Sequence, residues 1–427
     1  MLLVRAVAVG VVAALGCLVG CGGGSSAPVT YYKDVLPLVT AHCAGCHAPG
    51  GFAPFSLASY QEAQGHAALA AAATQSGEMP PWPPAAGCGD FQDARTLSAG
   101  EKAVFAAWAA AGAPAGDPPA AAAAGAVAGA VDRPDARPPV PTAKVDLGAP
   151  SVTLDPGVGY RPNATTTDDY HCFLFDPGLT SAQDLIGFDV HPGTPQSVHH
   201  VLVFAVRPAA VADAQARDAA DLQIGWPCFA GTGIGTGINR PPTIGGWVPG
   251  SSATAFPEGT GIRLEPGTWL VVQVHYNLLA GAAFADRTTV DLFYAAAPVA
   301  KRALVLPVLN DAFVIPAGAS DTVTTDFPVP PGSWSVWGVL PHMHLHGTEI
   351  KVSVEHATGD STCAIDIPRW NFHWQGFYYY KQPLQVGGGD VVHLACSYDN
   401  TAGTAPLSWG EKTSDEMCLN FAYVTPL

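Results

Sequence analysis

The feature that most constrains this fold is a long succession of short apolar runs separated by Pro, Gly, Asn and Asp, which begins near Lys144 and continues to the C-terminus. Such runs predict β-strands, and their regular spacing over roughly 280 residues predicts antiparallel β-sandwiches. This length suits two sandwich domains, which we place at residues 144–298 and 299–427, with the boundary near Pro298. The expected strands are Asp184–Val190, His199–Val206, Trp269–Tyr276, Val290–Tyr294, Trp334–Leu340, Glu349–Val354 and Val391–Cys396.

Helical periodicity marks the part of the chain that precedes these strands. Residues 31–41 have a helical pattern, and Ser98 with Glu101 has the spacing of a capping box at the start of a helix over Ser98–Ala111. We therefore expect a small all-α domain at residues 29–118. Residues 119–143 are nearly all Ala, Gly and Pro and predict a linker, so the position of the α-domain is expected to be adjustable.

The sequence CAGCH at residues 43–47 lies inside the predicted α-domain. It is the attachment signature of c-type haem, in which thioethers from Cys43 and Cys46 fix the porphyrin edge and His47 binds the iron. A disulfide or half of a zinc site is the alternative. We expect Met79, held by the prolines that follow it, to be the second axial ligand, with His66 as the competing ligand. This domain resembles a small class I cytochrome c.

The N-terminus predicts export. Residues 1–20 carry Arg5 and an apolar run too short for a membrane span. The run ends in LVGC and resembles a bacterial lipoprotein signal, so Cys21 is expected to be the lipid-modified first residue and residues 21–28 a tether on the periplasmic side or at the cell surface. An ordinary secretory signal is the alternative. Six more cysteines suggest disulfides in that oxidising compartment, at positions Cys88, Cys172, Cys228, Cys363, Cys396 and Cys418.

Composition agrees with an exported β-protein. Only 13% of residues are charged, and the chain has 47 Gly and 39 Pro, as a turn-rich fold requires. The formal net charge of -16 argues against nucleic acid as a partner. A membrane would be contacted through the lipid alone.

A concentration of histidines follows the expected strand Trp334–Leu340. The sequence PHMHLHG at residues 341–347 would place its three histidines, including His342 and His344, on one side of a strand, with Met343 and Leu345 directed into the core. Neutral imidazole is a common ligand of copper, zinc and iron, so this patch predicts a metal site. A solvated polar face of a sheet is the alternative.

Three further histidines are expected to form a second site. His199 and His200 begin a predicted strand, and adjacent residues can bind one metal only if the backbone departs from regular pleating or the rings use different nitrogens. His275 in QVHY would complete this set, or would be a core histidine. Near the C-terminus, Met417 in DEMC would place a thioether beside His342 and select copper over zinc; alone it would be an ordinary core methionine.

These motifs, in this order, resemble the type II copper, ascorbate-dependent monooxygenases, a family that includes the peptidylglycine α-hydroxylating and dopamine β-monooxygenases. The segments IPRWNFHWQ at residues 367–375 and CSYDN at residues 396–400 also resemble that family, and the resemblance covers roughly residues 145–427. It implies two jelly-roll sandwiches that face a solvent cleft and two copper ions. It further implies that one copper supplies electrons and the other is catalytic, the ligands being His199, His200 and His275 for the first and His342, His344 and Met417 for the second. Disulfides Cys172–Cys228 and Cys396–Cys418 are implied as well, which leaves Cys88 and Cys363 unassigned.

The resemblance implies hydroxylation of a C–H bond in an unknown small organic substrate by O2. Leu340 stands where peptidylglycine enzymes carry an arginine, and Leu419 and Phe421 stand where they carry asparagine and tyrosine, which argues against a peptide C-terminal glycine as substrate. The haem domain is expected to deliver electrons to the copper of His199, His200 and His275, because tethering raises the effective concentration of a donor. Ascorbate or a redox donor protein could supply them as well. A non-catalytic electron-transfer or copper-binding lipoprotein, and a zinc hydrolase or lyase, are the alternatives.

Overall fold

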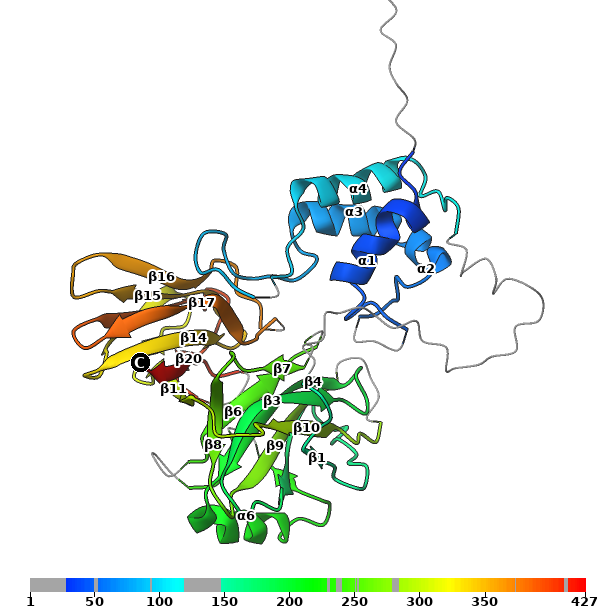
Figure 1. Cartoon of the computed structure of the whole chain (residues 1–427). Helices are drawn as coiled ribbons and strands as arrows, with labels where there is room; N and C mark the ends of the chain where they lie inside the picture. The colour runs from blue at the N-terminus through cyan, green and yellow to red at the C-terminus, as the bar shows by residue number, and fades with distance from the viewer. Residues whose placement is uncertain are drawn as a thin grey trace, which may run out of the picture.

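The computed structural model describes residues 28–49, 53–92, 94–118, 147–228, 231–235, 240–249, 251, 253–278, 284–372, 374–410 and 414–427. The predicted signal segment, Cys21 and the linker at residues 119–143 lie outside these residues. The described chain is mostly β-sheet, with most of its helices gathered in the N-terminal part (Figure 1). Among the described helices, none combines the length and the apolar character that a membrane crossing requires.

The N-terminal part is a helical unit with its own core. A capping box of Ser98 and Glu101 begins its last helix, as the sequence predicts, and a second capping box of Ser59 and Glu62 begins an earlier one. The apolar faces of the helices enclose a core centred on aromatic side chains such as Trp108. The elements are η1 (Tyr31–Val35), α1 (Leu36–His42), α2 (Tyr60–Gly65), α3 (Ala67–Ser76) and α4 (Ala99–Ala110).

The first sandwich packs a five-stranded sheet, in the order β5-β2-β9-β4-β6, on strands β1-β10-β3-β8 of a larger sheet. Its apolar core lies between these layers and includes Leu185, Phe188 and Val274. A short helix, α6, follows β4 where the sequence suggested only strands and turns. The elements are β1 (Val152–Leu154), β2 (Asp168–Phe175), β3 (Gln183–His191), β4 (Val198–Val206), η2 (Pro208–Ala210), α6 (Val211–Asp218), β5 (Trp226–Pro227), β6 (Thr243–Trp247), β7 (Thr254–Ala255), β8 (Thr260–Leu264), β9 (Trp269–Asn277) and β10 (Thr289–Tyr294).

The second sandwich packs strands β11-β20-β14-β17 on a four-stranded sheet in the order β13-β18-β15-β16. A separate core fills it, with Ile350, Ile365 and Cys396 fully buried. All seven strands expected from the sequence are present, within β3, β4, β9, β10, β14, β15 and β18. The elements are β11 (Lys301–Asn310), β12 (Val314–Ile315), β13 (Ser320–Pro328), β14 (Ser333–His342), β15 (Gly347–Glu355), β16 (Ser361–Ile367), β17 (Tyr378–Gly387), β18 (Val391–Asp399), β19 (Leu407–Ser408) and β20 (Cys418–Pro426).

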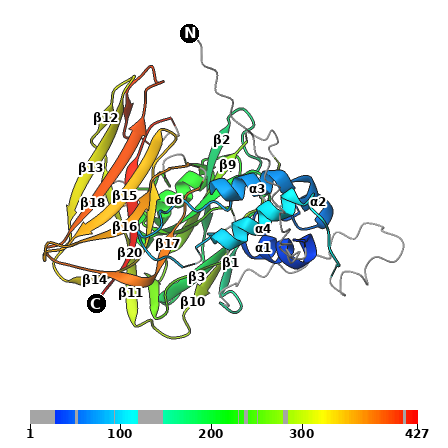
Figure 2. The same ribbon diagram turned by 90° about the horizontal axis from the view of Figure 1, so that it is seen from above.

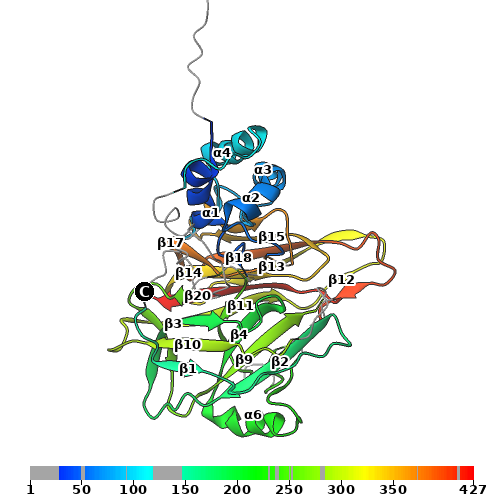
Figure 3. The ribbon, with the colours of Figure 1, turned by 90° about the vertical axis from the view of Figure 1, so that its right-hand side faces the viewer.

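One sheet runs through both sandwiches. Strand β11 pairs in parallel with β8, with Lys301 opposite Thr260 and Ala303 opposite Ile262, so nine strands form a single sheet. Figure 3 shows β14, β20, β11, β3 and β10 following one another across the molecule. Tyr423 of β20 is fully buried in the core of the first sandwich, and its hydroxyl lies 3.0 Å from the Thr260 hydroxyl. The two sandwiches therefore have a fixed relative position.

The chain between α3 and α4 docks on the second sandwich, and we call residues 82–92 the docking segment. Figure 1 shows it leaving the helices towards β17, and Figure 2 shows the helical unit alongside the sheets. The Cys88–Cys363 disulfide holds it, the Gln92 N–H donates to the Tyr379 carbonyl at 2.7 Å, and buried Phe91 joins the core of the second sandwich. This segment is bonded covalently and by a strand-like bridge, so the helical unit is tied to the second sandwich at a point besides the predicted linker, which limits the adjustable position expected of it.

The other two disulfides are Cys172–Cys228 and Cys396–Cys418, which confirms the pairing that the resemblance implied. Three disulfides are typical of a protein that folds outside the cytoplasm.

Candidate metal centres

The first set of histidines comes together at a β-bulge. In the pairing of β4 with β9, Val198 lies opposite Tyr276 and His200 opposite His275, so His199 is an extra residue in its strand. This is the departure from regular pleating that two adjacent histidines need in order to converge. The Nδ1 atom of His199 lies 3.3 Å from that of His200 and 3.2 Å from that of His275, and the last two are 3.3 Å apart.

This donor set fits a metal ion. A cation equidistant from three nitrogens with these separations lies about 1.9 Å or slightly more from each, close to the length of a metal–imidazole bond. Among the His, Cys, Asp and Glu side chains of the described residues, this is the set that brings three potential ligand atoms so close together. Burial lowers the pKa of His200 well below its usual value, and the neighbouring His275 and His199 lower that pKa further. A neutral ring needs to lose no proton before it binds a cation.

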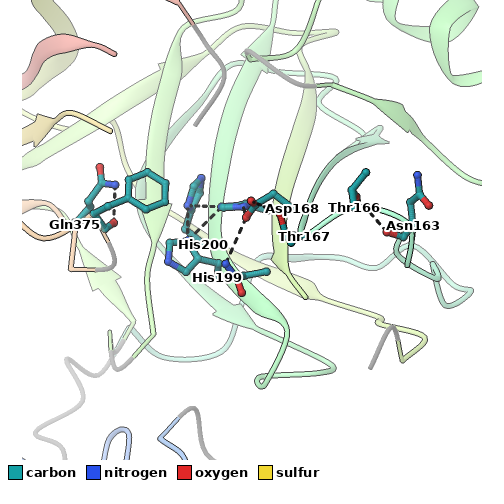
Figure 4. Close-up of polar contacts among 10 residues, drawn as sticks. Asn163, Thr166, Thr167, Asp168, His199, His200 and Gln375 are labelled. Carbon is teal, nitrogen blue, oxygen red and sulfur yellow. Dashed lines mark hydrogen bonds and ion pairs between the residues drawn. The ribbon is translucent and has the colours of Figure 1, made fainter. Parts of the chain in front are cut away.

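Strand β2 orients the rings of this set. The Nε2–H of His275 donates to a carboxylate oxygen of Asp168 at 2.9 Å, which directs Nδ1 towards the other two rings. The ring of Tyr170 stacks on His275 with centroids 4.0 Å apart. Figure 4 shows Asp168 on one side of His199 and His200 and Gln375 on the other. Sequence reasoning missed Asp168, because nothing near it in the sequence indicates that it lies beside His275.

The second set lies at adjacent strand ends of the second sandwich. His342 is the last residue of β14, His344 is in the following loop, and Met417 directly precedes β20. The Nδ1–H of His342 donates to the Gln375 side-chain oxygen at 2.6 Å, and that of His344 to the Asp415 carbonyl at 3.0 Å. Both rings thus present Nε2 as the acceptor atom. Burial lowers the pKa of His342 to about 3, with a further contribution from His344.

A buried carboxylate holds the loops of this set together. Glu416 is fully buried, and its oxygens accept the backbone N–H groups of His344 at 2.9 Å, His346 at 2.6 Å and Met417 at 3.3 Å. Burial raises its pKa to about 7, although these hydrogen bonds act in the opposite direction. Sequence reasoning gave Glu416 no role, and its position next to Met417 was the signal that could have suggested one.

The structure corrects part of the reading of PHMHLHG. Strand β14 ends at His342, so the alternation of faces does not continue through the motif. Met343 is buried as expected, but the prediction that Leu345 points into the core is wrong, because its side chain is 55% exposed. The Nδ1–H of His346 donates to the Asp399 carbonyl at 3.2 Å.

One phenyl ring contacts both sets. Phe372, in the loop between β16 and β17, stacks on His199 with centroids 5.7 Å apart and meets the ring of His344 edge-on at 6.1 Å. The imidazole centroids of His199 and His344 are therefore no more than about 12 Å apart. The same loop contributes Gln375, and its Trp370 indole N–H donates to the His344 carbonyl at 3.0 Å.

Both sets open into one continuous cavity of about 2540 Å³. Its lining includes His199 and His200 of the first set and all three residues of the second. The cavity also reaches the helical unit, where four candidate haem residues line it, namely Cys43, Cys46, His47 and Met79.

The residues of the helical unit fit a c-type haem. Cys43 and Cys46 are unpaired thiols. The Nδ1–H of buried His47 donates to the Phe55 carbonyl at 3.0 Å, which orients Nε2 for an axial bond. Met79 lines the cavity with His47, whereas the ring of His66 stacks on that of Phe55 and its Nδ1–H donates to the Glu62 carbonyl. Met79 stays the predicted second ligand, with His66 as the alternative.

Comparisons with known proteins find a similar domain for the second sandwich. Residues 303–426 match the copper type II ascorbate-dependent monooxygenase family, C-terminal domain. Human dopamine beta-hydroxylase is 23% identical over 312 residues, which are 69% of this chain and 48% of that protein. Peptidyl-glycine alpha-amidating monooxygenase A of Xenopus laevis is 21% identical over 290 residues, which are 64% of this chain and 28% of that protein.

The chain thus spans about half the length of the human relative and less of the frog one. The part that matches the monooxygenase domain contains His342, His344, Met417, Glu416 and Phe372, whereas the first set lies before it. Among solved structures, the infectious bursal disease virus VP2 subviral particle covers 64% of this chain and 70% of its own at 12% identity, and its TM-score of 0.18 carries no argument.

Proposed function

We propose that this protein is a copper-dependent monooxygenase that hydroxylates a C–H bond of a small organic substrate with O2. The observation that carries the proposal is the convergence of two histidine sets, one from each sandwich, on one cavity and on the same phenyl ring. The match of the second sandwich to a copper monooxygenase domain supports copper as the metal. So does the thioether of Met417, since soft sulfur ligands favour copper over zinc.

Copper held by the two sets would supply one-electron chemistry and activate O2, so that one oxygen atom enters an alcohol and the other leaves as water. The chain has three tasks. Asp168, Gln375 and Glu416 hold the ligands in fixed orientations, so that little reorganisation is needed during turnover. Phe372 places an apolar ring in contact with both sets, and the cavity admits the substrate.

The reaction consumes two electrons and two protons for each O2, and we propose that a class I cytochrome c domain at residues 29–118 relays the electrons. The cavity that joins CAGCH to both histidine sets supports this assignment. The docking segment supports it as well, because it ties the helical unit to the sandwich that holds His342 and Met417. The name of the matched family includes ascorbate dependence. Ascorbate or a redox protein would reduce the haem or the copper directly. Export and a lipid anchor at Cys21 complete the proposal.

Metal analysis tests the copper sites. Haem-matured protein without the lipid anchor should contain two copper ions per haem iron, and Met417→Ala should lose most of one. Met343→Leu is the matched control, because Met343 lies in the same motif but in the core, and it should keep both ions. Zinc, or one copper or none in the parent protein, would favour the non-catalytic electron-transfer alternative.

Stopped-flow absorbance tests the relay. Reduced haem mixed with O2 and substrate should oxidise faster in copper-loaded protein than in copper-depleted protein. Equal rates in the two samples would remove the haem from the catalytic cycle while leaving the monooxygenase assignment to the metal analysis.

A further inference from the structure

The sheet beside His342 presents an apolar surface to the cavity. In the pairing of β14 with β20, Leu340 lies opposite Phe421 and His342 opposite Leu419. Paired residues, and residues two apart in one strand, share a face of the sheet. These four side chains therefore form one block, and all four line the cavity.

Strand β11 widens this surface. Pro307 pairs with Phe421 and Leu309 with Leu419, so both lie on the same face, and both line the cavity. The intervening residue, Val308, points the other way and is buried in the core of the second sandwich. We call Leu340, Leu419, Phe421, Pro307 and Leu309 the apolar block.

The apolar block is partly uncovered. Leu309 is 37% exposed, and Leu340 and Phe421 are only half-buried. Leaving apolar surface in water costs about 25 cal/mol for each Å². A ligand that covers this surface gains that free energy, and it would do so directly beside a candidate metal ligand.

No member of the block carries a charge or a hydrogen-bonding side chain. His342 beside it already donates to Gln375. A carboxylate or ammonium group placed on these residues would lose water without gaining a partner. Charged side chains also line the cavity, namely Glu78, Arg95, Arg207, Arg240, Glu258, Asp311 and Lys381. Asp311, two residues beyond Leu309, is the acid nearest to the block in the sequence.

We propose that the substrate is uncharged where it reacts and that an aromatic or alicyclic hydrocarbon part sits on the apolar block beside His342. The reacting C–H bond becomes C–OH, O2 supplies that oxygen, and two electrons from the haem or ascorbate with two protons convert the other oxygen to water. The reaction rests on the proposed function, whereas the binding preference does not. The site would therefore discriminate by charge before any chemistry takes place.

Binding of three ligands of similar size tests this proposal. Ethylbenzene is neutral, 2-phenylethylamine is a cation and 3-phenylpropionate is an anion. Titration calorimetry on the full chain, loaded with copper and haem and kept under argon, should give the tightest binding for ethylbenzene. Tighter binding of either charged ligand overturns the proposal, and loss of amine binding in Asp311→Asn would assign the site to amines instead.

Variants locate the binding surface. Leu340→Asn should weaken ethylbenzene binding by about tenfold, because it removes roughly 50 Å² of apolar contact. Leu304→Asn is the matched control, since Leu304 is an exposed leucine of β11 that does not line the cavity, and it should bind as the parent does. Leu340→Arg should instead improve binding of 3-phenylpropionate. Equal affinities of the parent and both Leu340 variants would overturn the proposal, with circular dichroism confirming that each is folded.

Turnover separates this inference from the proposed function. Ethylbenzene that binds at the apolar block and yields 1-phenylethanol with matching O2 consumption supports both. Binding without product in copper-loaded, reduced protein leaves the binding inference standing and counts against the monooxygenase. Hydroxylation of the charged ligands alone would support the monooxygenase and overturn the binding inference.

Discussion

Asp168 and Gln375 act at the scale of single residues, each by accepting a hydrogen bond from one imidazole. They differ in which set they serve, since Asp168 orients His275 and Gln375 orients His342. Such partners fix the tautomer and direction of a ligand ring, and their loss typically lowers metal affinity by about 10–100-fold.

This division predicts reciprocal effects. Asp168→Ala should weaken copper binding at the first set by about 10–100-fold and leave the second set unchanged, and Gln375→Ala should do the opposite. Competition with a chelator, followed by electron paramagnetic resonance of each site, measures both affinities. A variant that weakens copper binding equally at both sets would show that the residue stabilises the fold and does not orient one particular ring.

His171 predicts a pH dependence of stability. It is buried on β2, its Nε2–H donates to the Ile224 carbonyl at 2.8 Å, and its Nδ1 has no hydrogen-bond partner among the described residues. Burial lowers its pKa. Below about pH 6.5, therefore, this histidine binds a proton in the unfolded chain but stays neutral in the folded protein. The free energy of unfolding then falls by up to ~1.4 kcal/mol for each pH unit below that point. Urea titrations at about pH 7 and pH 5.5 measure how much the free energy of unfolding falls between these values. This fall should be smaller in His171→Gln than in the parent protein, and an equal fall in both would contradict the prediction.

Sequence reasoning reached the candidate ligands but not the residues that orient them. Histidine is uncommon and its motifs are short, so His199, His200, His275, His342 and His344 stand out in the printed chain. Even the need for irregular backbone at His199 follows from the geometry of a strand, and the structure has a bulge there. Asp168 and Phe372 come from distant segments, and their contacts depend on tertiary packing that no local pattern encodes.

At the scale of elements, the docking segment predicts the result of removing one disulfide. Cys88→Ser with Cys363→Ser should leave both sandwiches folded but make proteolysis within residues 82–92 faster by about tenfold or more, because the remaining bonds there are few and local opening costs less. Limited proteolysis with mass spectrometry measures the rate. Lys381→Met is the control, since it removes only the exposed ion pair with Asp90 and should change little. Unchanged cleavage in the double variant would show that Phe91 and the backbone bonds suffice.

The strands with continuous apolar runs were predictable, and those with mixed patterns were not. Strand β11 alternates poorly, because Leu304 and Leu306 are exposed while Ala303 and Val308 are buried in different cores. Strand β17 carries three consecutive tyrosines followed by lysine, a pattern that fits neither the alternation of a strand nor the periodicity of a helix. Edge positions and shared cores weaken the alternation on which such predictions rest.

At the scale of the whole molecule, the shared sheet predicts that both sandwiches unfold together. Calorimetry should show one transition for the β-sheet part, and Tyr423→Phe should lower its stability by about 1 kcal/mol, because the Thr260 hydroxyl loses a buried partner. Val314→Ala at an exposed site of β12 is the control and should change the stability by less than about 0.5 kcal/mol. Two separate transitions, with only one shifted by Tyr423→Phe, would mean that the β8–β11 pairing does not couple the sandwiches.

This coupling was beyond the reach of the sequence. A parallel pair such as β8 with β11 has no turn signature, because a long connection joins its strands. Composition suggested two independent units and an adjustable third. The structure gives one continuous sheet with a bonded helical unit, and consequently a fixed gap between the two histidine sets.

The pairing of Cys88 with Cys363 also imposes an order on maturation. Cys88 follows CAGCH closely in the chain, while its partner is 275 residues later and is in place only when the second sandwich has folded. Until then, three thiols of the helical unit share an oxidising compartment, and a bond between Cys88 and Cys43 or Cys46 would destroy the proposed haem attachment site. Under the proposed haem attachment, thioether formation at CAGCH would have to precede the oxidation of Cys88, or a dedicated reductant would have to keep Cys43 and Cys46 as thiols until haem arrives. The proposed haem and the Cys88–Cys363 disulfide together would require haem ligation and disulfide formation to be successive steps on one chain.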